Sequence, residues 1–153
     1  MRHKKNMVKL GRSAEARKAL LSSMVANLVE EQRIKTTVTK AKQTRMLAEK
    51  MVTVAKKALA TATEPGAMLN GKTKALAVLR HRKHVDKLFN VIAPQFKDRV
   101  GGYTRITKLG RRGSDSSEMV ILEWVNLAPV SKRRKPKAEE AAAPEATETK
   151  KVE

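Results

Sequence analysis

The sequence predicts an α+β fold in which about four helices pack on a small mixed sheet of about three strands. Apolar residues recur at helical spacing over most of residues 13–94, whereas two runs after residue 100 alternate or are rich in β-branched residues. A basic arm precedes this domain, and a tail poor in apolar residues, expected to be disordered, follows it. We therefore divide the chain into an arm (residues 1–12), one domain (13–130), and a basic cluster with an acidic tail (131–153).

Charge indicates the class of partner. Lys and Arg number 34 against 15 Asp and Glu, which gives a formal net charge of +19 over 153 residues. This excess opposes compaction, so we expect a polyanionic partner, with nucleic acid as the first candidate and an anionic membrane surface as the second. The chain has no cysteine, which excludes disulfides and thiolate metal sites. No run approaches the roughly 18 apolar residues of a membrane span, so the chain is not expected to cross a membrane.

The first part of the domain predicts a helix followed by a strand. Ser13 is a suitable N-cap, and Leu, Met and Val recur after it at helical spacing, so the first helix is expected to end at Gln32 or Arg33. Residues 34–38 are β-branched at alternate positions. We expect them to form a third strand beside a later hairpin, because a two-stranded sheet alone is marginal.

A second helix is expected from Thr37 or Thr39 to about Ala60, with one apolar face and cations on the others. Such a helix could lie on a membrane, but it lacks Trp and Phe, and the first helix offers it a core partner. We therefore expect it to pack in the core with its cations turned to RNA, and no membrane partner is expected. Residues 61–71 are predicted to be a linker, since Glu-Pro-Gly at 64–66 breaks the helical pattern.

Two further helices and a hairpin complete the predicted domain. The third helix is expected over residues 72–81, and the fourth over residues 85–93, where Pro94 ends it. Residues 103–109 and 119–125 then predict two strands joined by a long polar loop with two adjacent arginines. Such a loop can reach into a phosphate-rich partner, although charge runs are often only solvated.

The arm and the hairpin region supply the candidate RNA-binding residues. The arm contains no acid and few apolar residues, so it is expected to order against RNA phosphates; a frayed terminus is the alternative. The sequence does not decide whether the Tyr103 ring stacks on a base or packs in the core. The candidates in the arm are Arg2, His3, Lys4, Lys5, Lys9 and Arg12. The candidates in the hairpin region are Arg99, Tyr103, Arg105, Lys108, Arg111 and Arg112.

Residues 66–73, Gly-Ala-Met-Leu-Asn-Gly-Lys-Thr, match the P-loop pattern letter for letter, which makes a nucleotidase the enzyme alternative. A P-loop follows a buried strand, whereas this stretch follows the alanine-rich end of a predicted helix. We therefore expect a linker here, and no enzymatic activity, cofactor or small-molecule substrate. His81 and His84 are three residues apart, but no Cys or carboxylate cluster completes a metal site with them, so no bound metal is expected.

Several stretches occur together in a characteristic order. They are Met-Arg-His-Lys-Lys at residues 1–5, Lys-Leu-Gly-Arg at 9–12, Ile-Lys-Thr-Thr at 34–37 followed by Lys-Ala-Lys at 40–42, Lys-Leu-Phe at 87–89, Gly-Gly-Tyr-Thr-Arg-Ile at 101–106, and the run from 113 to 125. In combination they resemble the bacterial large-subunit ribosomal protein L17 family over about residues 1–126.

The resemblance implies an α+β domain bound to large-subunit ribosomal RNA near the polypeptide exit tunnel. It also implies neighbouring large-subunit ribosomal proteins as partners and a place in the cytoplasmic bacterial ribosome. A generic DNA- or RNA-binding protein is the remaining alternative. Departures from the family pattern affect particular RNA contacts; they stand at Ala16, Ser22, Ser23, Ser114 and Glu118.

Overall fold

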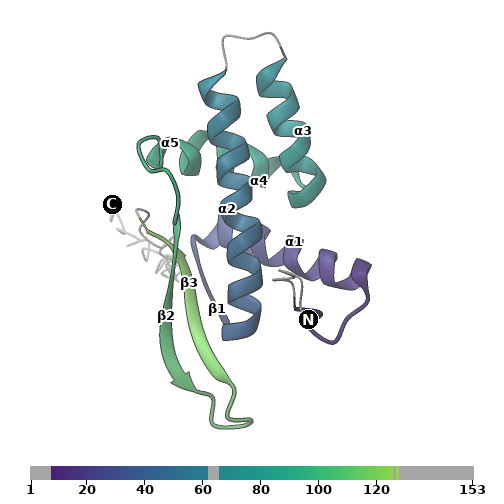
Figure 1. Cartoon of the computed structure of the whole chain (residues 1–153), viewed down its shortest axis with the longest axis vertical. Coiled ribbons are helices and arrows are strands. Elements are labelled where there is room, and N and C mark those ends of the chain that lie inside the picture. Colours follow the sequence, from purple (N-terminus) through teal and green to yellow (C-terminus); the bar gives the residue numbers. More distant parts are fainter. Residues whose placement is uncertain (1–7, 62–65, 126, 128–153) are drawn as a thin grey trace, which may run out of the picture.

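The computed structural model describes residues 8–61, 66–125 and 127, so the arm up to residue 7 and the tail predicted over residues 131–153 lie outside the described residues. The elements in chain order are α1 (Ala14–Glu31), β1 (Arg33–Thr37), α2 (Val38–Ala60), α3 (Ala67–Leu79), α4 (Arg82–Lys87), the π-helical turn η1 (Leu88–Ile92), α5 (Ala93–Gln95), β2 (Thr104–Arg111) and β3 (Glu118–Trp124). The long helix α2 runs along the molecule, with the sheet beside its N-terminal half and α3 to α5 beside its C-terminal half (Figure 1). The predicted α+β class is confirmed.

The sheet has the strand order β1-β3-β2, so β3 is central. Both pairings are antiparallel, with Ile34 opposite Leu122 in one and Ile106 opposite Leu122 in the other. The expected third strand is therefore confirmed, but the expectation of a mixed sheet was wrong. The physical reason is that β1 joins the hairpin on the side of β3 and runs against it, which the sequence of β1 alone does not specify.

One face of the sheet packs on α2 to form the core. Val120, Leu122 and Trp124 alternate along β3 and are at most 1% exposed. Trp124 also donates its indole Nε1–H to the carbonyl of Leu28 over 3.0 Å, which satisfies its polar atom inside the core. Leu28 and Val52 belong to the apolar stripes predicted for α1 and α2, and both are fully buried. The sequence therefore identified the faces of both long helices correctly.

The predicted linker before α3 was too long. α3 begins at Ala67, so residues 67–71 are helical rather than linker. The reason is a close helix contact: a Cβ built on Gly71 would lie 2.3 Å from the Cβ of Ala58 on α2. Glycine at this position lets α3 pack directly on α2, and that tertiary contact extends the helix beyond what the local pattern predicts. α3 ends at Leu79, followed by Arg80 in the left-handed region at φ 62°.

The predicted fourth helix is longer than expected and is irregular. It begins at Arg82 and continues through η1 and α5 to Gln95, so Pro94 lies inside its last turn. Within η1 the amide of Ala93 donates to the carbonyl of Leu88, five residues earlier. A proline lacks an amide hydrogen and its ring clashes with the carbonyl four residues before it, and the wider π turn relieves this conflict. Pro94 therefore distorts the helix rather than ending it.

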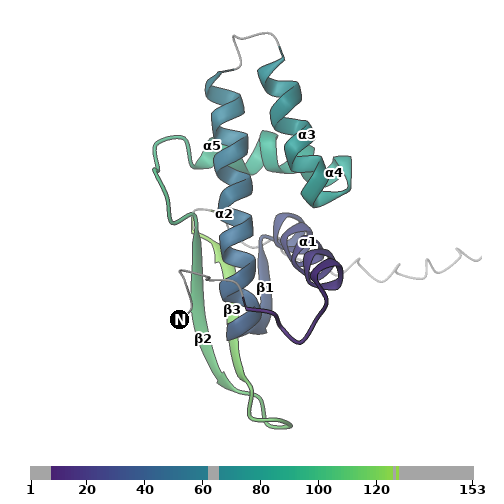
Figure 2. The same cartoon turned by 45° about the vertical axis from the view of Figure 1, so that its right-hand side comes forward.

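At the loop end the hairpin strands reach one or two residues further than predicted, because β2 (Thr104–Arg111) ends later and β3 (Glu118–Trp124) begins earlier, which shortens the loop to residues 112–117. A bulge between Lys108 and Gly110 interrupts the pairing, and Gly110 takes φ 93°, a value that favours glycine. The hairpin tip projects past the beginning of α2 (Figures 1 and 2). Arg111 therefore belongs to β2, and only Arg112 of the predicted arginine pair lies in the loop.

Candidate nucleic-acid interface

The described end of the arm is folded against the helices. The amide of Val8 donates to Oε1 of Gln43 on α2 over 3.4 Å, and a turn is closed by the Arg12 amide and the Lys9 carbonyl at 3.2 Å. Arg12 also donates from Nη1 to the carbonyl of Leu10 over 2.8 Å. These contacts leave Lys9 and Arg12 exposed beside the beginning of α1. The other arm candidates, Arg2, His3, Lys4 and Lys5, lie outside the described residues.

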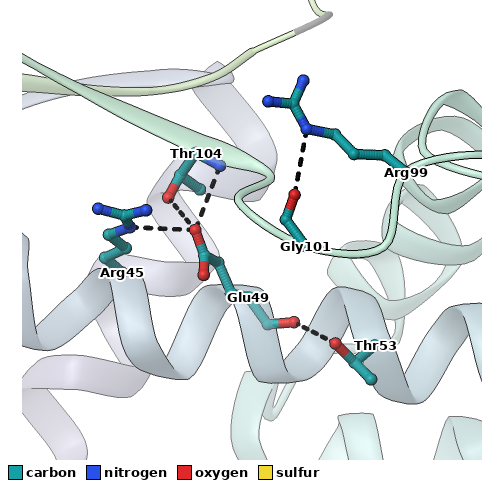
Figure 3. A network of polar contacts seen from close by, with 6 residues as sticks. All are labelled: Arg45, Glu49, Thr53, Arg99, Gly101 and Thr104. Atoms are coloured by element: carbon teal, nitrogen blue, oxygen red, sulfur yellow. Dashed lines mark hydrogen bonds and ion pairs between the residues drawn. The ribbon is translucent and has the colours of Figure 1, made fainter.

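Glu49, the one acid in the sequence of α2, points toward β2. Its Oε1 accepts hydrogen bonds from the Oγ1 of Thr104 at 2.9 Å and from the amide of Thr104 at 3.4 Å (Figure 3). The same oxygen accepts from Nε of Arg45 at 3.1 Å. Glu49 therefore holds the beginning of β2 against α2. Most cations of α2 are exposed instead; they are Lys42, Arg45, Lys50 and Lys57.

A second tie holds the loop before β2. Lys56 donates from Nζ to the carbonyl of Arg99 and to the hydroxyl of Tyr103, and its ammonium lies 5.3 Å from the centre of the Tyr103 ring. Tyr103 is 2% exposed, and its ring centre is 5.2 Å from that of Phe96. Tyr103 thus lies in the core and offers no open ring face to a base. Arg99 is exposed, and its Nε donates to the carbonyl of Gly101 at 3.1 Å (Figure 3).

Arg105 lies on the side of the sheet that faces away from α2. It donates to Oε1 of Glu123 from Nε at 3.0 Å and from Nη2 at 2.6 Å. Nε of Arg33 on β1 lies 3.4 Å from Oε2 of the same carboxylate. Sequence reasoning missed Arg33 and Glu123 as members of this cluster, because only the register of the sheet brings the three side chains side by side.

An ion pair orders the hairpin tip. Arg112 donates to both carboxylate oxygens of Asp115, at 2.9 and 2.6 Å. Asp115 also accepts from the Ser117 hydroxyl at 2.8 Å and the Ser117 amide at 3.2 Å. The hydrogen bonds from Arg112 and then from Ser117 hold the pKa of Asp115 well below its usual range, and the same pair raises the pKa of Arg112. Arg112 therefore shapes the tip, while Lys108 and Arg111 are the exposed cations beside it.

The candidate residues extend along the molecule rather than meeting at one point. From Thr104 to Arg111 the strand spans roughly 23 Å at about 3.3 Å per residue. Arg99 lies near the first end of that span, Lys108 and Arg111 near the second, and the arm turn is held on α2. Exposed cations distributed over this length fit a long phosphate backbone better than a small ligand.

The P-loop pattern does not form a phosphate cradle. Gly66 is the residue before α3, and the next seven residues form its first two turns, with the Asn70 amide donating to the Gly66 carbonyl at 2.9 Å. The preceding described element is α2, a helix rather than a buried strand. Lys72 lies 4.0 Å from Asp86, on an exposed surface. The nucleotidase alternative therefore has no support in this geometry.

Neither a metal site nor a membrane span occurs among the described residues. No group of three or more His, Asp or Glu residues is placed there to hold a metal ion. Nor is any helix in that part of the chain long and apolar enough to cross a membrane. The His81 and His84 rings meet edge to face at 5.6 Å, and Nε2 of His84 lies 3.5 Å from Oε2 of Glu30 at the end of α1.

A small, strongly basic α+β domain with exposed cations on an arm, a long helix and a hairpin has the properties of a nucleic-acid-binding protein. The family model described as ribosomal protein L17 matches residues 20–125. The chain belongs to this family.

Similar proteins extend the match to most of the chain, and each is named large ribosomal subunit protein bL17. The protein of Fusobacterium nucleatum is 46% identical over 125 residues, which cover 82% of this chain and 100% of the relative. That of Methylacidiphilum infernorum is 40% identical over 140 residues, with 91% and 100% covered. That of Rhodopseudomonas palustris is 43% identical over 126 residues, with 82% and 84% covered.

Proposed function

We propose that this protein is a structural constituent of the large subunit of the bacterial, cytoplasmic ribosome. In this role it binds large-subunit ribosomal RNA, contacts neighbouring ribosomal proteins and catalyses no reaction. The observation that carries the proposal is the family match over residues 20–125, together with relatives that are named as proteins of the large subunit. The net charge of +19 supports it independently, because a polyanion is needed to balance such an excess.

The mechanism is charge neutralisation combined with shape. Lysine and arginine side chains displace counterions from packed RNA segments, which favours binding through the release of those ions. Six exposed members of the candidate set suit this role: Lys9, Arg12, Arg99, Arg105, Lys108 and Arg111. Arg2, His3, Lys4 and Lys5 extend the same set along the arm by sequence. Arg112 contributes through the conformation of the tip, and Tyr103 through the position of the loop that carries Arg99.

Two acidic residues near these cations support the proposal, because both are hydrogen-bonded within the protein. Glu49 accepts from Thr104 and Arg45, and Asp115 accepts from Arg112 and Ser117. These carboxylates hold the strand and the loop that present the cations. Their negative charge is partly neutralised where it arises, so it repels a phosphate backbone less than a free carboxylate would.

Two experiments test the proposal. Stoichiometric co-sedimentation with the large subunit in moderate salt is expected, and its absence would contradict the assignment to the ribosome. Binding of the purified protein to large-subunit ribosomal RNA should weaken linearly in log affinity against log salt. Equal affinity for a DNA duplex of matched length would instead favour the generic nucleic-acid-binding alternative.

A further inference from the structure

The outer face of the sheet is a separate surface, opposite the core. Because side chains alternate along a strand, the burial of Val120, Leu122 and Trp124 against α2 places Ile121 and Glu123 on the other side of β3. Paired residues of neighbouring antiparallel strands share a face. The outer face therefore carries the rows Arg33–Glu123–Arg105 and Lys35–Ile121–Thr107.

No described helix is packed over this face. α2 contacts all three strands from the core side, as both views show (Figures 1 and 2). The side chains of Arg33 and Arg105 are 45% and 61% exposed, and Lys35 and Thr107 are also exposed. The face is therefore an open surface in the part of the chain that the structure describes.

Glu123 holds the two arginines of this face in place. One carboxylate oxygen accepts from Nε and Nη2 of Arg105, and the other lies 3.4 Å from Nε of Arg33. The Glu123 side chain is only 14% exposed, because the two guanidinium groups flank it. A planar guanidinium engaged in this way loses little further freedom on binding, and its remaining N–H groups are still available for a phosphate.

The charges of this face indicate which class of molecule it binds. Arg33, Lys35 and Arg105 outnumber the single carboxylate of Glu123, so the face is cationic. The arginines stand on strands about 10 Å apart across β3, and Lys35 lies about 7 Å along β1 from Arg33. Ile121, half-buried, is the apolar side chain among them, and Met119, also half-buried, lies further along the same side of β3. A surface with cations this dense and with little apolar area is complementary to a phosphate backbone rather than to an apolar surface of a partner protein.

We propose that the outer face of the sheet is an additional contact surface for the ribosomal RNA backbone, formed by Arg33, Lys35 and Arg105, with Glu123 as the positioning residue. This inference rests on the proposed RNA-binding function and adds to it a surface that the arm and the hairpin tip do not include. Arg33, Lys35 and Glu123 were not among the residues that the sequence indicated.

The first test uses the full chain and large-subunit ribosomal RNA over a salt series. Replacing Arg33 and Lys35 together by Ala should flatten the slope of log affinity against log salt by about 0.7 to 0.9 for each phosphate that is no longer neutralised. The matched control is Arg82→Ala with Lys74→Ala, which removes the same charge from exposed positions on α4 and α3. Equal slopes for the two double variants would overturn the proposal, because they would show only a general charge effect.

The second test asks whether removal of one negative charge strengthens or weakens RNA binding. Glu123→Gln makes the protein more positive, so general electrostatics predicts tighter RNA binding; a positioning role predicts weaker binding instead. The control Asp98→Asn makes the same change at an exposed position outside the face and should not weaken binding. Arg105→Lys keeps the charge but removes the paired hydrogen bonds, so it should also bind more weakly. Tighter binding by Glu123→Gln, with the variant folded by circular dichroism, would overturn the positioning role.

The two proposals fail in different ways. If the unaltered protein does not bind the RNA, the proposed function itself is wrong. If it binds and the Arg33 and Lys35 variant keeps the full slope on naked RNA, only the outer-face proposal is wrong. Failure of that variant to enter the subunit, with RNA binding unchanged, would show that a neighbouring protein covers the face.

Discussion

Gly71 of α3 lies directly against Ala58 of α2, so closely that a Cβ on Gly71 would stand 2.3 Å from the Cβ of Ala58. The same Cβ would also contact the ring of Phe89 at 3.4 Å. This contact joins the second half of α2 to the small helices, and both residues are buried. The second glycine of the P-loop pattern is therefore explained by helix packing.

We predict that Gly71→Ala destabilises the protein despite the better helix propensity of alanine. Overpacking of a core contact costs about 1 to 3 kcal/mol, whereas alanine gains up to about 1 kcal/mol over glycine within a helix. Because the Cβ of Ala58 cannot rotate away from a Cβ placed 2.3 Å from it, the cost should lie in the upper part of that range, which leaves a net destabilisation of about 1 to 2 kcal/mol. Urea unfolding followed by circular dichroism measures it. Gly113→Ala is the control, since nothing lies within 4 Å of a Cβ there; an unchanged midpoint for Gly71→Ala would contradict the packing argument.

We predict that Lys72→Ala leaves RNA binding and subunit incorporation intact apart from a small electrostatic effect. Its one ion pair in the structure, with Asp86 at 4.0 Å, is exposed and is therefore worth about 1 kcal/mol or less. In a P-loop the corresponding lysine reaches the nucleotide phosphates, so its removal would be severe. Complementation of growth by the variant protein is the measurement. Failure to support growth with a folded variant would restore the nucleotide-site hypothesis.

We predict that deletion of residues 1–12 flattens the salt dependence of RNA binding by about 0.7 to 0.9 for each phosphate that the arm neutralises. Arg111→Ala should flatten it further and nearly additively, because the arm turn and the hairpin are separate elements. The domain should stay folded, since Ser13 still caps α1 through the amide of Ala16. Filter binding across a salt series measures the slopes. If both variants keep the full slope, these cations face solvent, and the exposed cations of α2 must provide the binding.

Arg112→Ala is predicted to act differently from Arg111→Ala. Arg112 is engaged with Asp115, so its removal should disturb the conformation of residues 112–117 more than it weakens any interaction with phosphate. Amide exchange at Ser117, whose amide donates to Asp115, should increase in this variant and stay unchanged in Arg111→Ala. Equal exchange at Ser117 in both variants would contradict this distinction.

The hairpin tip should also respond to acid in a defined direction. The pKa of Asp115 is lowered in the folded protein by its hydrogen bonds from Arg112 and Ser117. Its ionised form therefore stabilises the tip fully at neutral pH, and that stabilisation disappears as the pH falls through the lowered folded-state pKa. An NMR titration of the Asp115 carboxyl group should give a midpoint below the ordinary range for aspartate. A midpoint within that range would show that the ion pair does not persist in solution. Arg112→Ala should raise the midpoint toward that range, although the hydrogen bonds from Ser117 still lower it.

Features that depend on local pattern and on charge could be predicted from the amino-acid sequence alone. The stripe that includes Val25 and Leu28 defines the buried face of α1, and the Ser13 cap defines where that helix begins. Alternation shows which residues of β3 face the core, since Val120, Leu122 and Trp124 recur with the period of a strand. The excess of cations indicates a polyanionic partner without any structure.

Long-range packing, by contrast, decides which distant residues meet. The antiparallel register of β1 on β3 brings Arg33 to Glu123, and no local pattern contains that information. Tyr103 could have stacked on a base, but its place beside Phe96 and under Lys56 buries it. The Gly71 contact with Ala58 turned a predicted linker into helix, and Pro94 was accommodated by a π turn instead of ending its helix. For Gly71 and Pro94, long-range packing outweighed local preferences against the helix of about 1 kcal/mol for glycine and about 3 kcal/mol for proline.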